Sequence, residues 1–297
     1  MLFIDIIIPV FLMVSAGFGL EKAGKLDFRT LTFSSLYLFT PALVFASLIK
    51  HDLNPTLARD VLVFMLLYTG IFLLIAKGAG KLFRMDRDTQ SALALTTVVM
   101  NIGNFGLPLT YFAFGEAGLE TSIMTFVMFN IPLGTLAIVL AQGSQISLSE
   151  ALGNMAKIPI FHAVLLAFLW KVLHLHMPLF LLRPIELLGQ AAIPVMLVML
   201  GMQLANTRIG SWPVFLTLSS VLRLGVAPLL AWLLTVILGI EAISQKVLIL
   251  QTSTPAAVLP LLYSLRFGTR PDLVAGAILT STLLSSISLT VLLYFLQ

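Results

Sequence analysis

The chain of 297 residues contains 10% charged and 59% apolar residues, whereas a soluble domain carries about 25% charged residues. The chain has too few charged side chains to cover the surface of a globular protein in water. It is therefore expected to lie in a lipid bilayer. The net charge of +4 does not indicate nucleic-acid binding, because the basic residues are scattered between apolar runs, and the absence of cysteine excludes disulfides and thiolate chemistry.

Ten apolar runs are long enough to cross a bilayer, since a transmembrane helix needs about 20 mostly apolar residues. They lie at residues 3–20, 31–49, 61–80, 90–113, 121–141, 156–174, 185–205, 212–238, 242–264 and 273–296. The first run lacks a preceding basic segment and a small-residue cleavage site, so it is interpreted as a span rather than a signal peptide. The predicted fold class is an all-α integral membrane protein with ten transmembrane helices.

Lysine and arginine are enriched in the cytoplasmic loops of membrane proteins. The loops between spans 1–2, 3–4, 5–6, 7–8 and 9–10 hold eleven of these residues, and the loops on the other side hold five. This distribution predicts a multi-pass protein of the cell (inner) membrane with both termini on the extracytoplasmic side.

The two halves of the chain share landmarks in the same order, which predicts an internal repeat. The matching landmarks are Ile8–Phe11 with Ile158–Phe161, Pro41 with Pro194, and Asn104 and Pro108 with Gln251 and Pro255. Each half, 1–145 and 146–297, holds five spans, an odd number, so the halves are expected to have opposite topology in the membrane. Inverted repeats of this kind are typical of secondary carriers.

The fourth and ninth spans contain residues that are unfavourable inside a helix. The fourth contains Asn101, Gly103, Asn104, Gly106 and Pro108, and the ninth contains Gln251, Thr252, Ser253, Thr254 and Pro255. Interrupted helices at corresponding positions of two repeats indicate a carrier's binding site, and the helix N-termini at the breaks suit an anion. Ordinary proline kinks with polar helix–helix contacts are the alternative for either span alone, but the matched pair favours a binding site.

The pattern Asn-x-Gly-x-x-Gly-x-Pro at Asn101–Pro108 resembles the fourth helix of the auxin efflux carrier family, which includes plant auxin carriers and bacterial carriers of malonate and similar acids. Gln251–Pro255, followed by Leu259-Pro260 and Phe267-Gly268, is similar to the ninth helix of that family. Further similar segments run the length of the chain, at Pro9–Gly24, Pro41–Leu43, Pro194–Leu204 and Arg223–Pro228.

The resemblance implies a fold shared with bile-acid/sodium symporters. Spans 1, 2, 6 and 7 would form a scaffold, and spans 3–5 and 8–10 a moving transport core in which spans 4 and 9 cross at their prolines. It also implies an elevator-type motion and a homodimer built on the scaffold helices. By motif position, Asn101 and, across the crossover, Gln251 and its neighbours would hold a carboxylate.

Arg223 is the only charged residue well inside a predicted span, about 16 Å along the eighth at 1.5 Å per residue. A charge near the middle of the membrane is costly and indicates a function. Two hypotheses stay open: Arg223 attracts an anion in the cavity, or it donates to exposed carbonyls of a broken helix.

The predicted function is secondary active transport of small organic anions, such as mono- or dicarboxylates, across the bilayer. The predicted substrate-binding residues are Asn101, Asn104, Gln251, Thr252, Ser253, Thr254 and Arg223, and the helix-break residues are Gly103, Gly106, Pro108 and Pro255. The alternatives are a membrane sensor or partner subunit that binds the solute without moving it, and a sodium-coupled symporter of a larger amphipathic acid.

Enzymatic and ATP-driven functions are not expected, because the sequence contains no Gly-x-Ser-x-Gly, His-Glu-x-x-His or P-loop motif. No metal or cofactor is expected either, since the four histidines lack metal-ligand spacing. Coupling to protons or sodium stays open.

Overall fold

The computed structural model describes residues 3–24, 27–50, 55–142, 159–207, 212–240 and 242–296. Over these residues every regular element is a helix, and the expected boundary between the halves, at 145/146, lies outside them. Six helical segments of the described chain are long and apolar enough to cross a membrane: Ile4–Lys22, Phe28–Lys50, Pro55–Leu82, Leu179–Ala205, Pro213–Ile237 and Pro271–Leu296. The expected all-helical membrane architecture is confirmed.

The helices are α1 (Ile8–Lys22), α2 (Phe28–Ser34), α3 (Thr40–Lys50), α4 (Pro55–Leu82), α5 (Arg87–Val98), α6 (Leu107–Gln142), α8 (Pro159–Val172), α9 (Leu179–Ala205), α10 (Pro213–Val221), α11 (Ala227–Ile237), α12 (Ala242–Thr252), α13 (Leu259–Phe267) and α14 (Pro271–Leu296). The π-helical segments η1 (Phe3–Ile7), η2 (Ser35–Phe39), η3 (Ile102–Gly106) and η4 (Leu222–Val226) lead directly into the helices that follow them. Gly115 has φ 61° and ψ −153°, which divides α6 into 107–114 and 116–142.

One residue separates the end of each π-helical segment from a proline. The prolines are Pro9, Pro41, Pro108 and Pro228. Proline lacks an N–H, and its ring clashes with the carbonyl four residues earlier. In η2, η3 and η4 the residue before the proline donates instead to the carbonyl five residues earlier. The prolines therefore widen these helices by one π turn without ending them.

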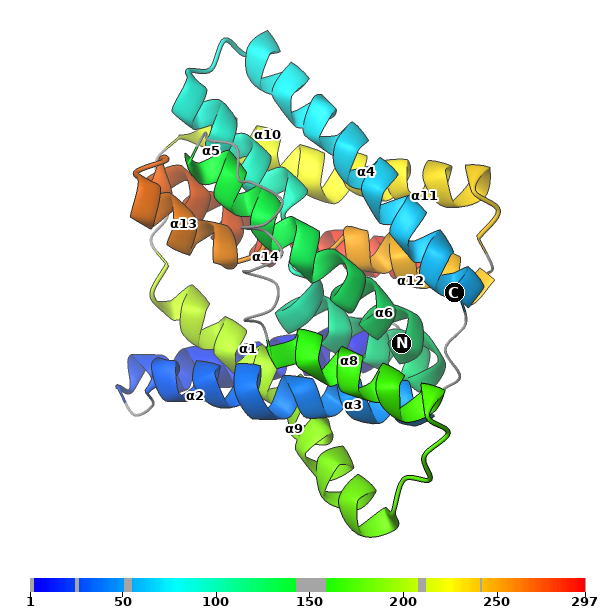
Figure 1. Cartoon of the computed structure of the whole chain (residues 1–297). Helices are drawn as coiled ribbons and strands as arrows, with labels where there is room; N and C mark the ends of the chain where they lie inside the picture. Colours follow the sequence, from blue (N-terminus) through cyan, green and yellow to red (C-terminus); the bar gives the residue numbers. More distant parts are fainter. Residues whose placement is uncertain are drawn as a thin grey trace.

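The helices pack as two groups (Figure 1). The first helix group contains α1, α2, α3, α8 and α9, in which α9 packs against α1, α2 and α3, and α3 packs against α8. The second helix group contains α4, α5, α6 and α10–α14, in which α5 packs against α4 and α14, and α12 packs against α6 and α11.

Helices α1 and α9 of the first group approach each other closely at two glycines. A Cβ atom at Gly17 would lie 2.0 Å from the Val198 carbonyl oxygen, and one at Gly201 would lie 1.9 Å from the Val14 carbonyl oxygen. Small residues let helix backbones approach in this way within a membrane. Any side chain at either glycine must therefore push the two helices apart.

We expect Gly201→Ala to lower the melting temperature of the purified protein in detergent, with a loss of about 1–3 kcal/mol from overpacking. Gly19→Ala is the matched control, because a Cβ added at Gly19 of α1 would meet no described atom within 4 Å apart from the nearby backbone of its own helix. If the two variants melt at the same temperature, the close α1–α9 contact does not contribute to stability.

Candidate functional site

Two interruptions of helical geometry face each other inside the second helix group. The first covers 99–101, between α5 and η3, and the second covers 253–258, between α12 and α13. Met100 of the first break and Ala256 of the second form an isolated antiparallel bridge. The two broken helices thus meet at these residues.

Main-chain hydrogen bonds join the two breaks. The Asn101 N–H donates to the Pro255 carbonyl at 2.9 Å, and the Ala257 N–H donates to the Val99 carbonyl at 2.9 Å. Non-helical backbone at membrane depth is tolerated only where its polar groups find partners in the protein or a water-filled cavity. Each break supplies such partners for the other.

The expected helix-break residues do not all lie in the breaks. Pro255 lies inside the second break, but Gly103 and Gly106 lie in η3, and Pro108 lies in the first turn of α6. The structure therefore corrects the expected crossing at both prolines: the first break lies at 99–101, because a π turn accommodates Pro108 within the helix.

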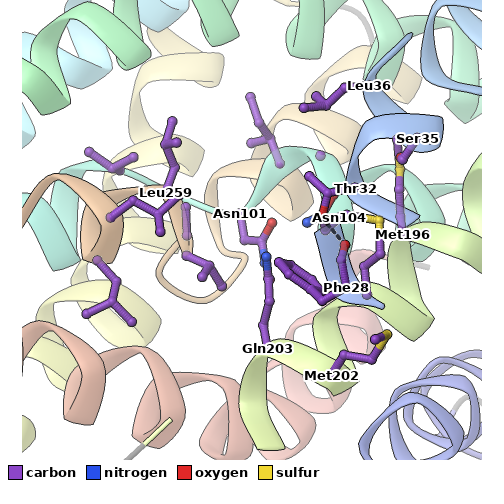
Figure 2. Close-up of a pocket in the computed structure, with 18 of the residues that line it drawn as sticks. Phe28, Thr32, Ser35, Leu36, Asn101, Asn104, Met196, Met202, Gln203 and Leu259 are labelled. Carbon is purple, nitrogen blue, oxygen red and sulfur yellow. Dashed lines mark hydrogen bonds between the residues drawn. The ribbon is translucent and has the colours of Figure 1, made fainter. Parts of the chain in front are cut away.

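A cavity of about 520 Å³ lies beside the crossed breaks, between the two helix groups. The first helix group contributes residues of α2, η2 and α9, and the second contributes the first break, η3 and the start of α13. Figure 2 shows this arrangement around Asn101. Most of the wall is apolar, and the described residues that line it include no lysine, arginine, histidine, aspartate or glutamate.

Asn101 and Asn104 are the predicted substrate-binding residues that line this cavity. Asn101 is 6% exposed, and its Nδ2 atom has no hydrogen-bond partner among the described residues. Asn101 precedes η3 and Val258 precedes α13, and neither side chain caps the helix that follows. Two helix N-termini without a side-chain cap therefore adjoin the cavity, and such termini favour negative charge. At α13 Pro260 has no N–H and the Leu261 N–H donates to the Val258 carbonyl, so η3 offers more N–H groups than α13.

Gln203 of α9 also lines the cavity, although the sequence did not single it out. Figure 2 shows its side chain pointing toward Asn101 from the opposite wall, and its Oε1 atom is buried without a partner in the described chain. Met196, Met199 and Gln203 share one face of α9, since residues three and four apart are neighbours on a helix. A single glutamine on an otherwise apolar helix face is the sequence feature that could have identified Gln203 as a candidate site residue.

The tract Gln251–Thr254 is buried but does not line the cavity. The hydroxyls of Thr252, Ser253 and Thr254 donate to main-chain carbonyls three or four residues earlier, at 2.6–2.7 Å. These hydrogen bonds therefore lie within α12 and the turn that ends it. None of the three hydroxyls faces the cavity of about 520 Å³.

Gln251 joins α12 to α6 behind the breaks. Its Nε2 group donates to the Thr110 hydroxyl at 3.2 Å and also to the Ser122 hydroxyl. A Cβ atom at Gly106 would lie 2.3 Å from Gln251 Oε1, so glycine is required there for this close approach. These contacts give Gln251 a structural role, and the predicted contact of Gln251 with a solute stays a prediction.

Arg223 of η4 is fully buried and does not line the cavity. Its Nη1 group donates to the Thr97 carbonyl in the last turn of α5 at 2.6 Å, and its Nη2 group donates to the Tyr68 hydroxyl at 3.4 Å. The guanidinium carbon also lies 5.6 Å from the centre of the Phe72 ring. These contacts match the hypothesis that Arg223 donates to carbonyls of a broken helix, and they leave its positive charge without direct contact with the cavity.

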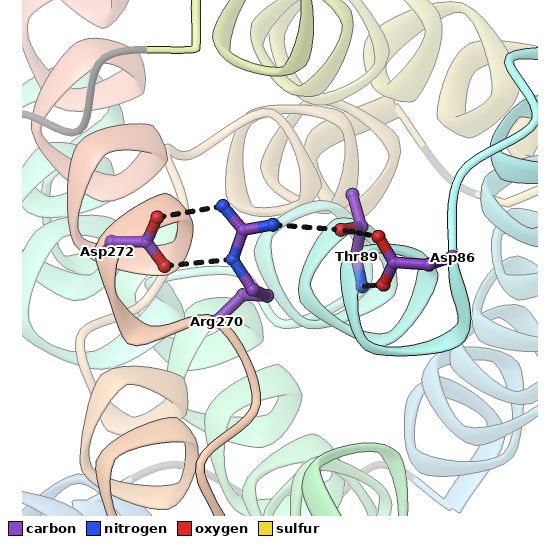
Figure 3. A network of polar contacts seen from close by, with 4 residues as sticks. All are labelled: Asp86, Thr89, Arg270 and Asp272. Atoms are coloured by element: carbon purple, nitrogen blue, oxygen red, sulfur yellow. Dashed lines mark hydrogen bonds and ion pairs between the residues drawn. The ribbon is translucent and has the colours of Figure 1, made fainter.

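The other end of α5 is held by a polar network (Figure 3). The Asp86 carboxylate caps the helix by accepting from the Thr89 N–H at 3.0 Å and the Thr89 hydroxyl at 2.9 Å. Arg270 donates to the Thr89 hydroxyl at 3.3 Å and to both Asp272 oxygens at 2.9 and 3.1 Å. The two bonds from Thr89 hold the pKa of Asp86 below its ordinary value. The helix that leads into the first break is thus fixed at both ends.

Comparison with known proteins agrees with this architecture. A family model described as "Membrane transport protein" matches residues 2–293. The chain belongs to this family. The resemblance to the auxin efflux carrier family, drawn from the motifs of spans 4 and 9, is thereby confirmed.

Two archaeal relatives cover nearly the whole chain. The uncharacterized transporter MJ1031 of Methanocaldococcus jannaschii is 25% identical over 300 residues, which cover 95% of this chain and 94% of the relative. An uncharacterized transporter of Methanothermobacter thermautotrophicus is 28% identical over 296 residues, which cover 96% and 95%. The family and the apolar helices together make the protein a multi-pass membrane transporter.

We expect Gln251→Leu to destabilise the protein by about 1–3 kcal/mol, because it leaves the buried Thr110 and Ser122 hydroxyls without their partner. The melting temperature in detergent measures this loss. Gln245→Leu is the matched control in the same helix, since the Gln245 side chain is only partly buried and donates to Thr235 alone. An equal loss in both variants would contradict a special role for Gln251.

We expect Asp86→Ala to lower stability at pH 7 by about 1 kcal/mol, as for other N-caps, and Asp86→Asn to lose less because asparagine still caps. The folded pKa of Asp86 is depressed. The stability from its charge is therefore complete above its unfolded pKa of about 3.9 and disappears as the pH falls through the folded pKa. Melting temperatures of wild type and Asp86→Asn should converge at low pH, and a constant difference would contradict this account.

Proposed function

We propose that this transporter is a secondary carrier of small organic anions that works by alternating access at the crossed breaks. One observation carries the proposal. The cavity lies where the two helix groups meet the crossing. It offers Asn101 Nδ2, which has no partner among the described residues, together with two helix N-termini that no side chain caps. Such groups replace the water shell of an anion by fixed dipoles.

We infer that the chain forms ten spans in two inverted repeats, with Gly115 separating the fourth span from the fifth. The packing supports this inference, because two pairs of helix contacts correspond when the halves are exchanged. Contact of spans 1 and 7 (α1 with α9) corresponds to contact of spans 6 and 2 (α8 with α3). Contact of spans 4 and 10 (α5 with α14) corresponds to contact of spans 9 and 5 (α12 with α6).

In this proposal the first helix group is the scaffold, which also forms a homodimer, and the second is the transport core that moves as an elevator. A second cavity of about 390 Å³ supports alternating access, because it also lies between the two groups. Its lining includes Lys50, Glu116 and Glu186, near the loops expected outside the cytoplasm. The larger cavity extends to Asn206 and Thr207, beside the loops expected inside, so in this proposal the two cavities lie toward opposite sides of the membrane.

The chemistry of the larger cavity favours a monocarboxylate with an apolar body. One carboxylate is matched by the N–H groups at Asn101 and the helix N-termini. A second carboxylate would lie against methionine, leucine and phenylalanine side chains with no cation in the described wall. Burying an unpaired charge costs several kcal/mol, so dicarboxylates are disfavoured relative to monocarboxylates.

We expect Asn101→Ala to abolish solute binding and uptake while leaving the melting temperature without ligand nearly unchanged. The side-chain Nδ2 has no partner among the described residues to lose, and the main-chain bond to Pro255 remains. Asn206→Ala is the matched control: Asn206 also lines the cavity, but its Nδ2 is already bonded to Glu21 at 2.6 Å. This control should retain binding.

The measurement is the melting temperature in detergent with benzoate, phenylacetate, malonate or succinate, with and without sodium, followed by uptake into proteoliposomes. A ligand that binds only the folded state stabilises it by about 2.7 kcal/mol at 100 times Kd. Stabilisation without uptake would favour the sensor or partner subunit, and sodium-dependent stabilisation would favour the sodium-coupled symporter. Normal uptake by Asn101→Ala contradicts the site, and no response to any carboxylate contradicts the organic-anion class.

A further inference from the structure

The charge of Arg223 has no counter-charge in the described part of the chain. A guanidinium stays protonated in proteins, and Arg223 is fully buried. Its contacts are a carbonyl, a hydroxyl and an aromatic ring, all neutral, and none of the ion pairs between described residues includes it. Its Nε group has no hydrogen-bond partner there either. An unpaired buried charge is expensive and in a membrane protein indicates a function.

The neutral contacts stabilise this charge without cancelling it. Tyr68 and Phe72 stack on each other in α4, with ring centres 5.4 Å apart. The face of the Phe72 ring attracts the cation, as aromatic faces do, and the Thr97 carbonyl accepts one of its protons. The net charge of +1 therefore persists inside the protein.

Arg223 lies close behind the wall of the larger cavity. It is bonded to Thr97, and Val99, two residues further along, lines the cavity. Consecutive Cα atoms are about 3.8 Å apart, which places the guanidinium on the order of 10 Å from the cavity wall. Arg223 is fully buried, so mobile ions screen the interaction little.

We propose that Arg223 is a specificity-determining residue: it makes a cavity whose described wall holds no charged residue prefer an anion over a neutral solute of the same shape. The inference rests on the proposed carboxylate solute, which supplies the missing counter-charge when it binds. Arg223 does not touch the solute. Coulomb attraction at ~10 Å with an effective dielectric constant of ~20 corresponds to roughly tenfold in affinity.

The test compares phenylacetate with phenylacetamide, which has nearly the same shape and no charge, by their dissociation constants for the full-length protein in detergent. Wild type should prefer the anion by roughly tenfold or more. Arg223→Gln and Arg223→Met should lose about tenfold of this preference, and Arg223→Lys should retain it. Tyr68→Phe is the control that removes a hydrogen bond of Arg223 but keeps the charge, so its preference should equal that of wild type.

A structural role alone would weaken both probes equally, because misplacing Thr97 distorts the wall for either solute. An unchanged preference in the folded Gln or Met variant overturns the inference and leaves the proposed function intact. Failure of wild type to bind phenylacetate or any other carboxylate of the panel overturns the proposed function, and this inference with it.

A measurement on wild type keeps the inference testable even if the neutral variants do not fold. Because a buried charge is screened little, the ratio of the two dissociation constants should change less than about twofold between 50 mM and 500 mM sodium chloride. Chloride that competes for the same site weakens both probes equally and leaves the ratio unchanged. A steep fall of the ratio with salt would assign the preference to exposed basic loops and overturn the role of Arg223.

Discussion

The paired main-chain hydrogen bonds between the two breaks are the constraint on which the rest of the structure depends. An unsatisfied peptide group in hydrocarbon costs several kcal/mol, so a single open break inside a membrane helix is not stable. Here Asn101 and Ala257 donate to carbonyls of the opposite break. Neither interruption is satisfied without the other. The pairing also fixes where the uncapped helix N-termini lie, and hence where the cavity can offer N–H groups to a solute.

Buried polar side chains hold the crossing from behind. Gln251 joins α12 to α6 through two hydroxyls, and Arg223 joins η4 to the last turn of α5. Neither side chain lines the cavity. In the proposed carrier, neutral amides and main-chain groups therefore form the polar part of the cavity wall. The side chains of Gln251 and Arg223 lie behind this wall and fix its position.

The coarse architecture and the family could be predicted from the sequence, because apolar runs, loop charges and the Asn101–Pro108 motif depend on local composition and spacing. The roles of the polar residues could not. A hydroxyl such as that of Thr252 always has a carbonyl of its own helix within reach, so the sequence does not tell whether it faces a cavity. Pro108 marks a distortion of its helix, but only the packing decides between a break and a π turn. Gln203 becomes important because α9 packs against η3, about a hundred residues earlier in the chain.

In the proposed carrier, α9 belongs to the stationary scaffold and lies at its boundary with the moving transport core. One of its faces is locked to α1, since at Gly201 and Val198 main-chain atoms of the two helices are in direct contact. Such contacts leave no side chain that could adjust, so sliding there would force backbones to collide. Another face carries Met196 and Met199 toward the cavity. Methionine side chains are flexible and adapt to changing neighbours, so a transport core can move along this face while the α1–α9 crossing remains fixed.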